Sequence, residues 1–252
     1  MMQSIIYILN MIKKIILSLL FIFLQVSLLK SVIADDTTPP PEIGKLGRTA
    51  PGGSSWKRSI IQETGSVCGL SQKPLTALIP ENLIGLTVND YPTFLVYIPT
   101  NSAQKAFFEL KDETGKIIYK ISVKNPHEII GVFSLNIPNK SEKLALEIGK
   151  NYKWTFTLIC NFRYRSQDLI VGGSIQRVKL TQETIEQLRK ASKRDRPAIY
   201  GKAGIWHEAL TELAELRRLY PQDKKITNDW QKILKQVKLD DIAEEPLVQP
   251  QK

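Results

Sequence analysis

The sequence predicts an α+β protein in which an antiparallel β-sandwich at residues 68–180 is followed by a small helical module at residues 181–245. Short apolar runs that alternate with polar residues fill the first region, and this period of two is typical of half-buried strands. From Thr181 onward the apolar spacing changes to about 3.6 residues, which is typical of amphipathic helices. The strands should therefore come first in the chain, with the helices grouped behind them.

The strongest predicted strand covers residues 152–160, where large apolar residues occupy every second position. Its aromatic and β-branched residues suit a pleated surface. One face would carry Tyr152, Trp154, Phe156, Leu158 and Cys160. Side chains of this size on one face need an opposing sheet to cover them, which favours a sandwich.

Other short apolar runs bounded by turn-forming residues have the same character, and the runs before and after residues 112–115 predict a hairpin. These runs are residues 75–79, 93–98, 105–111, 116–123, 129–137, 144–148 and 169–178. In the last run, the pair Gly172 and Gly173 predicts a bulge. Eight or nine short strands without intervening helices favour antiparallel pairing, and an immunoglobulin-like or fibronectin-like sandwich is the predicted architecture.

Four helices are predicted after the strands. Thr181 can cap the first, the second should begin near Asp195, the third should cover residues 205–220, and the fourth should start near Ile226. The side chains expected to face inward are Ile185, Leu188, Ala191, Trp206, Ala209, Leu210, Leu213, Leu216, Tyr220, Ile226, Trp230, Ile233, Leu234 and Val237. Residues 246–252 are predicted to be a disordered tail.

Residues 199–221 contain an aromatic, a turn glycine, a second aromatic, a small residue, two large apolar residues and a final proline. These are Tyr200, Gly204, Trp206, Ala209, Leu213, Leu216 and Pro221. The spacing resembles one tetratricopeptide repeat, which needs neighbours to cover its faces. The charged side chains expected to face outward would leave an incomplete groove for a partner. They are Lys202, His207, Glu208, Glu212 and Arg217.

The N-terminus has the pattern of a secretory signal peptide at residues 1–34. Lys13 and Lys14 precede an apolar core, and Ala34 offers a small residue for cleavage. An uncleaved anchor helix is the alternative, because the apolar stretch is long. Residues 35–67 are rich in proline and glycine near their start and are predicted to be a flexible linker. The predicted location is periplasmic or extracellular.

The charge of +10 falls to +7 when residues 1–34 are removed, which leaves 32 basic and 25 acidic residues. Export makes nucleic acid the weakest candidate partner of a basic chain. The even pair Cys68 and Cys160 favours one disulfide in an oxidising compartment. Two cysteines and two histidines without close ligand spacing do not predict a metal site, and nothing predicts a cofactor.

A wider set of motifs lies at residues 74–82, 85–87, 92–94, 149–154, 158–160, 203–206, 213–218 and 242–248. Together they resemble an uncharacterised family of exported cyanobacterial proteins, domain of unknown function 928. The resemblance implies a signal peptide and the same order of strands and helices, but it brings no catalytic residue or cofactor. The segment 161–167 has more aromatic residues than the family pattern.

That segment carries the candidate binding loop, Phe162, Arg163, Tyr164 and Arg165. Alternating aromatic and guanidinium groups can bind a polysaccharide or an anionic partner. Alternatively, both aromatic side chains pack against the sandwich edge. His127 and His207 are interpreted as surface residues, because no nucleophile motif accompanies them.

The favoured function is a non-enzymatic envelope protein that acts as a binding or assembly scaffold for protein or glycan partners. A hydrolase-type enzyme with loop site residues and a purely structural surface component are the alternatives. The sequence does not determine the ligand or the oligomeric state.

Overall fold

The structure is a computed structural model that describes residues 59–60, 67–69, 73–81, 84–139 and 144–248. The predicted signal peptide at 1–34 and most of the predicted linker lie outside these residues. Ser59–Ile60 form strand β1, which pairs with β2, so the linker prediction is wrong at these two positions.

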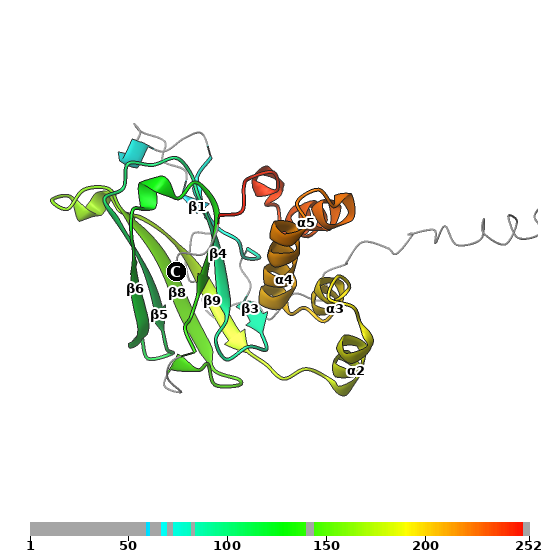
Figure 1. Cartoon of the computed structure of the whole chain (residues 1–252). Helices are drawn as coiled ribbons and strands as arrows, with labels where there is room; N and C mark the ends of the chain where they lie inside the picture. The colour runs from blue at the N-terminus through cyan, green and yellow to red at the C-terminus, as the bar shows by residue number, and fades with distance from the viewer. Residues whose placement is uncertain (1–58, 61–66, 70–72, 82–83, 140–143, 249–252) are drawn as a thin grey trace, which may run out of the picture. The chain divides into compact units, whose positions relative to one another are not determined.

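Two sheets form a sandwich-like arrangement (Figure 1). One sheet has the order β1, β2 (Leu75–Ala77), β4 (Thr93–Ile98) and β7 (Gly131–Asn136). The other has the order β3 (Ile84–Thr87), β9 (Leu169–Arg177), β8 (Asn151–Ile159), β5 (Lys105–Lys111) and β6 (Ile117–Val123). β3 pairs with β9 in parallel, so the prediction of a purely antiparallel sandwich is wrong for this pair.

Within the described residues, four α-helices follow the strands, as predicted. They are α2 (Gln182–Lys190), α3 (Arg196–Lys202), α4 (Trp206–Leu219) and α5 (Lys224–Gln236). The Thr181 side chain accepts a hydrogen bond from the Thr184 amide, which confirms the predicted cap of α2. Leu188 is the buried residue of α2, whereas Ile185 is 40% exposed and does not face inward as expected. Short 3-10 helices lie at η1 (Val67–Gly69), η2 (Pro126–Glu128), η4 (Arg165–Gln167) and η5 (Asp240–Ile242).

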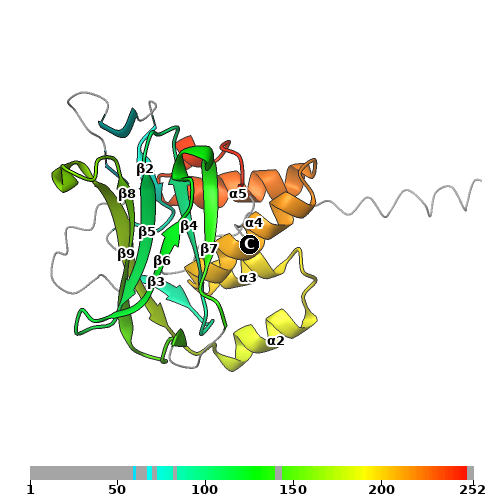
Figure 2. The same ribbon diagram turned by 60° about the vertical axis from the view of Figure 1, so that its left-hand side comes forward.

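Strand β4 lies between two hydrophobic clusters because its side chains alternate between its two faces. Phe94, Val96 and Ile98 pack toward β5 and β8 in the sandwich interior. Leu95 and Tyr97 belong to the second cluster, with the buried residues of the helices. Figure 2 shows this order in space, with the helices on one side of β4 and β7 and with β5 and β8 on the other.

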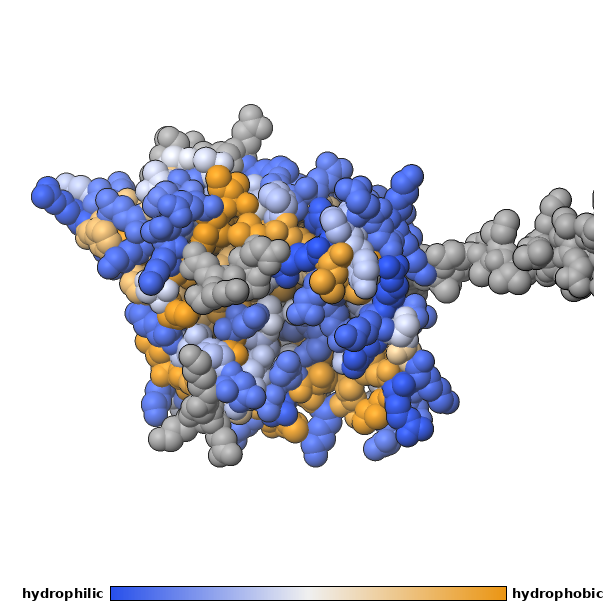
Figure 3. All heavy atoms as spheres, viewed as in Figure 1, coloured by the Kyte–Doolittle hydropathy of each residue, from blue (hydrophilic) through white to orange (hydrophobic). Residues whose placement is uncertain are grey.

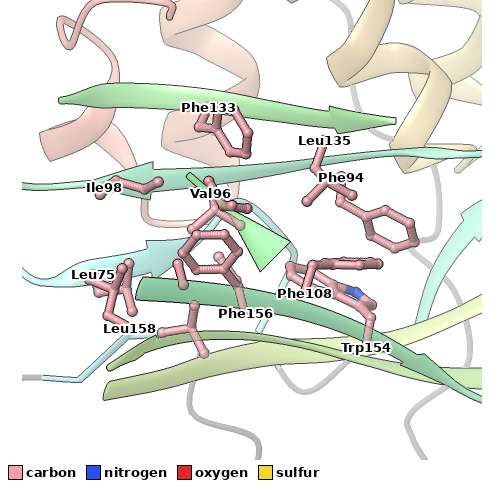
Figure 4. Packing of buried hydrophobic residues seen from close by; sticks show 14 of the residues in the cluster. Leu75, Phe94, Val96, Ile98, Phe108, Phe133, Leu135, Trp154, Phe156 and Leu158 are labelled. Atoms are coloured by element: carbon pink, nitrogen blue, oxygen red, sulfur yellow. The ribbon is translucent and has the colours of Figure 1, made fainter. Parts of the chain in front are cut away.

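Aromatic rings occupy the centre of the sandwich interior (Figure 4). The ring of Phe94 lies 5.0 Å from that of Trp154 and 4.8 Å from that of Phe108, in tilted arrangements. The inward face of β8 therefore contacts the opposite sheet, as the sequence pattern predicted. Trp154 and Phe108 are both fully buried.

Two local strand predictions differ from the structure. The register of β8 with β9 runs unbroken through Gly172 and Gly173, so there is no bulge. These glycines instead allow close packing, because a Cβ atom on Gly172 would collide with the Trp154 carbonyl oxygen. The predicted strand at 144–148 is absent from its described residues, where Ile148 forms an isolated bridge to Arg177.

Pro246, Leu247 and Val248 form a C-terminal strap along β7, although the sequence predicted a disordered tail from residue 246. The Val132 amide donates to the Pro246 carbonyl at 2.7 Å, and the Val248 amide donates to the Val132 carbonyl at 2.9 Å. Gly131 makes this approach possible, because its φ is +124° and a Cβ atom there would collide with the Pro246 carbonyl.

Substituting Gly131 with alanine should therefore release the strap and lower the free energy of unfolding by more than about 1 kcal/mol. Urea denaturation would measure the loss, and faster hydrogen exchange at the Val248 amide would locate it. Gly115→Ala is a matched control, since its φ is also positive, +85°, but a Cβ atom there meets nothing within 4 Å. An equal loss for both variants would show that backbone conformation alone, and not the strap, determines the effect.

Candidate binding surface

The candidate binding loop is held at both ends. β8 ends at Ile159, and the next residue, Cys160, forms a disulfide with Cys68, with the Cα atoms 4.9 Å apart. Beyond it, the Asn161 side-chain oxygen accepts a hydrogen bond from the Arg163 amide at 2.8 Å. The loop then passes through η4 into β9. Its conformation is therefore fixed covalently at the start and by local hydrogen bonds further on.

Both aromatic side chains of the loop are open to solvent. Phe162 is 52% exposed and Tyr164 is 61% exposed, so neither packs against the sandwich edge. The Lys105 ammonium lies 5.6 Å from the centre of the Phe162 ring, a cation–π distance. Figure 3 shows hydrophilic side chains around a small apolar patch at the end of the molecule that carries η4.

The two arginines of the loop have different surroundings. Arg165 Nε donates to Asp168 Oδ2 at 2.7 Å, and this bond raises the pKa of the guanidinium above its usual value. Asp168 is largely shielded from solvent in this pair. Arg163 is exposed and has no acidic partner among the described residues. Arg163 is thus the guanidinium available to a partner, and Arg165 stabilises the loop.

A hollow beside α3 and α4 is a second candidate surface and has a volume of about 210 Å³. Its lining residues are Lys193, Arg196, Glu212, Glu215, Leu216 and Leu219. Burial raises the pKa of Glu212 above its usual value, and Arg196 opposes this rise. The hollow lies on the hairpin for which the sequence predicted a partner groove, and Lys202 of the same hairpin is exposed as expected.

His207 is buried, with 4% of its surface exposed, so its interpretation as a surface residue is wrong. Nδ1 lies 3.2 Å from the Thr93 carbonyl oxygen, and a carbonyl can only accept, so Nδ1 carries the proton. Nε2 points at Gly85, where a Cβ atom would come within 2.6 Å of it. The ring therefore fits against β3 because residue 85 has no side chain.

Glu208 and Arg217 are also less exposed than predicted. Glu208 Oε1 accepts hydrogen bonds from the Thr87 hydroxyl at 2.6 Å and from the Val88 and Asn89 amides at 3.1 Å. Desolvation raises the pKa of Glu208 above its usual value. Arg217 donates to the Glu245 carbonyl at 3.2 Å. Glu208 joins α4 to the chain after β3, and Arg217 joins α4 to the chain after η5, so fewer charged side chains face outward than predicted.

The two histidines of the chain, His127 and His207, lie apart from each other. His127 is exposed on η2, 3.8 Å from Glu128, whereas His207 belongs to α4 and is buried against β3. No group of three or more histidine, cysteine, aspartate or glutamate side chains that could hold a metal ion occurs in the described part of the chain. Within the same part, no helix has the length and apolar character needed to cross a membrane.

The sequence pattern indicated the loop but not two residues that complete it, Lys105 and Asp168. Lys105 is at the start of β5, far from the loop in sequence, and only the pairing of Lys105 with Ile159 brings the two together. Asp168 follows Arg165 by three residues, and this spacing is a local signal that could have indicated the ion pair.

The chain matches the model of one known family. The model of the family Domain of Unknown Function (DUF928) matches residues 54–247, so the chain belongs to this family. No curated protein matches the chain, and no solved structure matches it.

The stability of the fold should fall as the pH drops from about 6.5 to about 4, in part because of His207. Burial lowers the pKa of His207 to about 4 from an ordinary value of 6.5, so the neutral ring is favoured in the folded state. This contribution is complete above pH 6.5 and is lost as the pH falls toward 4, and it amounts to about 3 kcal/mol. Urea denaturation across this range would measure it.

The control for this prediction is His207→Asn, whose side-chain amide can still donate to the Thr93 carbonyl but does not titrate. The variant should lose stability at pH 7 because it is smaller, yet show a shallower fall between pH 6.5 and 4. The raised pKa of Glu208 acts in the opposite sense in both proteins. Equal slopes in the two proteins would contradict the assignment to His207.

Proposed function

We propose that this protein is a non-enzymatic scaffold of the cell envelope, exported by a cyanobacterium to the periplasm or the cell exterior, that binds or assembles protein or glycan partners. The observation that supports this proposal is the candidate binding loop, where Phe162 and Tyr164 are exposed on a segment fixed by a disulfide. Exposed aromatic and arginine side chains on a rigid loop are favoured at binding surfaces, because little conformational entropy is lost on binding.

Two further observations support a binding role over catalysis. His207 is enclosed by Phe94, Gly85 and Thr93, and Glu208 is bound to backbone amides, so neither faces a substrate-sized opening. The aromatic groups of the loop, by contrast, face solvent. The predicted signal peptide supports export, and the disulfide is consistent with an oxidising compartment.

We also propose two finer structural assignments. The sandwich belongs to the immunoglobulin-like or fibronectin-like class, in which binding loops gather at the sandwich ends. The α3–α4 pair is a tetratricopeptide-like hairpin, whose hollow lined by Arg196 and Glu212 offers a second partner surface. A structure determined by experiment and aligned with members of both classes would test the assignments.

Replacing Arg163 with alanine should weaken capture of partners from envelope fractions at least fivefold without changing the melting temperature. The loop guanidinium is exposed and has no acidic partner among the described residues, so its removal costs the fold little. Affinity capture after crosslinking, quantified by mass spectrometry, would measure the effect.

Lys232→Ala is the control, because it removes one exposed charge from α5. Arg165→Ala should instead lower stability slightly, since Asp168 loses its partner. If Arg163→Ala captures the same partners as the unchanged protein, the loop does not bind them. A hydrolytic activity that is lost with loop substitutions would contradict the non-enzymatic role.

A further inference from the structure

The outer face of the five-stranded sheet continues the candidate binding loop. Side chains alternate along β5, so buried Ala106, Phe108 and Leu110 face the interior and the residues between them face outward. The register carries the same alternation to β6 and β8, because Glu109 pairs with Lys120 and Lys111 pairs with Lys153. We call the following residues the basic strip: Lys105, Phe107, Lys111, Lys120, Lys153, Phe162, Arg163 and Tyr164.

The strip contains two lysine–phenylalanine pairs at neighbouring positions. The Lys105 ammonium lies 5.6 Å from the centre of the Phe162 ring, and the Lys120 ammonium lies 5.0 Å from that of Phe107. Lys105 and Phe107 are successive outward residues of β5 and so lie about 7 Å apart along the strand. Each pair places a positive charge beside an aromatic ring, and the pairs repeat along one direction.

The strip has more positive charge than its own acid can balance. Glu109 lies 3.2 Å from Lys111 and 2.7 Å from Lys120, and these lysines lower the pKa of its carboxyl group. Lys105 and Arg163 have no acidic partner in the described ranges, and both are exposed. A surface of this kind attracts negative charge, and the effect is strongest at low salt.

We propose that the basic strip binds an acidic polysaccharide, with the loop aromatics stacking on sugar rings and Lys105 and Arg163 binding carboxylates. This inference rests on the proposed function and specifies the partner of the same loop. The seven residues of β5 extend for about 24 Å, which suits a linear polymer with regularly spaced charges.

A chain of sugars also fits the groups between the charges. Half-exposed Thr157 offers a hydroxyl to hydrogen-bond with sugar hydroxyls, and it faces outward between Phe107 and Ile170 in the register. A membrane surface would instead favour apolar side chains gathered at one tip, with the cations behind them. Here two rings lie on the loop, but Lys105, Phe107 and Lys111 continue the cations and rings along β5 behind it, which favours the polymer.

The test is binding of the exported, oxidised protein to alginate, a polymer of uronic acids, measured by affinity electrophoresis or calorimetry. Neutral dextran and phosphatidylglycerol vesicles serve as competing probes. The charge-reversed pair Lys105→Glu with Arg163→Glu should weaken alginate binding at least tenfold. The matched control reverses two exposed lysines of α5, Lys224→Glu with Lys232→Glu, and changes the net charge by the same amount.

The expected result is alginate binding that weakens as salt rises, falls in the strip variant and persists in the control. Phe162→Ala should reduce the binding that remains at high salt, since stacking is not screened. Equal loss in both charge-reversed pairs would overturn the proposal, because net charge alone would then explain binding. Stronger binding to the vesicles would overturn it in favour of a membrane surface.

The experiments distinguish a wrong polysaccharide partner from a wrong scaffold role. If Arg163→Ala loses envelope partners but the protein does not bind alginate, the scaffold role stands and the acidic polysaccharide is wrong. If neither alginate binding nor the capture of any envelope partner depends on the loop, both the acidic polysaccharide and the scaffold role are wrong. Circular dichroism at each step shows whether a variant remains folded.

Discussion

Replacing Trp206 with alanine should lower the free energy of unfolding by about 3 to 5 kcal/mol. The indole is 1% exposed at the start of α4, within the cluster that joins the helices to β4. Its Nε1 donates to the Leu78 carbonyl at 3.0 Å, so the substitution leaves a cavity and an unpaired buried carbonyl. Urea denaturation followed by circular dichroism would measure the loss.

Trp206→Phe separates the two causes, because it keeps most of the buried volume and removes only the hydrogen bond. We expect it to lose about 1 to 3 kcal/mol. If Trp206→Ala melts like the unchanged protein but no longer captures partners, the indole is an exposed contact with a partner. That result would contradict its buried position.

Removing the disulfide should have an effect of similar size. The bond joins Cys68 to Cys160 across a sequence separation of 92 residues, and closing so long a loop stabilises by about 4 kcal/mol through the unfolded state. The double variant Cys68→Ser with Cys160→Ser should therefore unfold at a clearly lower urea concentration.

Mass spectrometry of the exported protein without reduction should find no thiol that can be alkylated. The unchanged protein treated with a reductant is the control, since it should reproduce the stability of the double serine variant. Two cysteines that can be alkylated in the native, unreduced protein would contradict the pairing.

Strong local patterns predicted most of the elements. The alternation on β8 and the helical spacing on α4 and α5 come from residues whose burial is decided by their own element, so the sequence alone was sufficient. β3 was missed because Ile84–Thr87 is too short to show a period. Its parallel pairing with β9 is a contact between distant segments, and no local pattern encodes it.

The buried residues of α4 were predicted less well than its apolar stripe. His207 and Glu208 follow Trp206 directly, and a helix with one covered face would expose them. Here β3 and the chain after it cover a second side of α4, and Gly85 provides the space that the imidazole fills. A glycine in one segment that accommodates a side chain from another leaves no signal at the histidine itself.

The strap along β7 has a consequence for the order in which the chain can fold. Val132 is hydrogen-bonded to Pro246 and Val248, and Trp230 Nε1 donates to the Ala243 carbonyl at 3.0 Å. These bonds need residues that come after every strand and α-helix of the described chain. Domains often fold from the N-terminus during synthesis, yet β7 cannot gain these hydrogen bonds until the chain through Val248 has left the ribosome. The edge of β7 at Val132 therefore stays without these partners until the helices that follow it in the sequence have been synthesised.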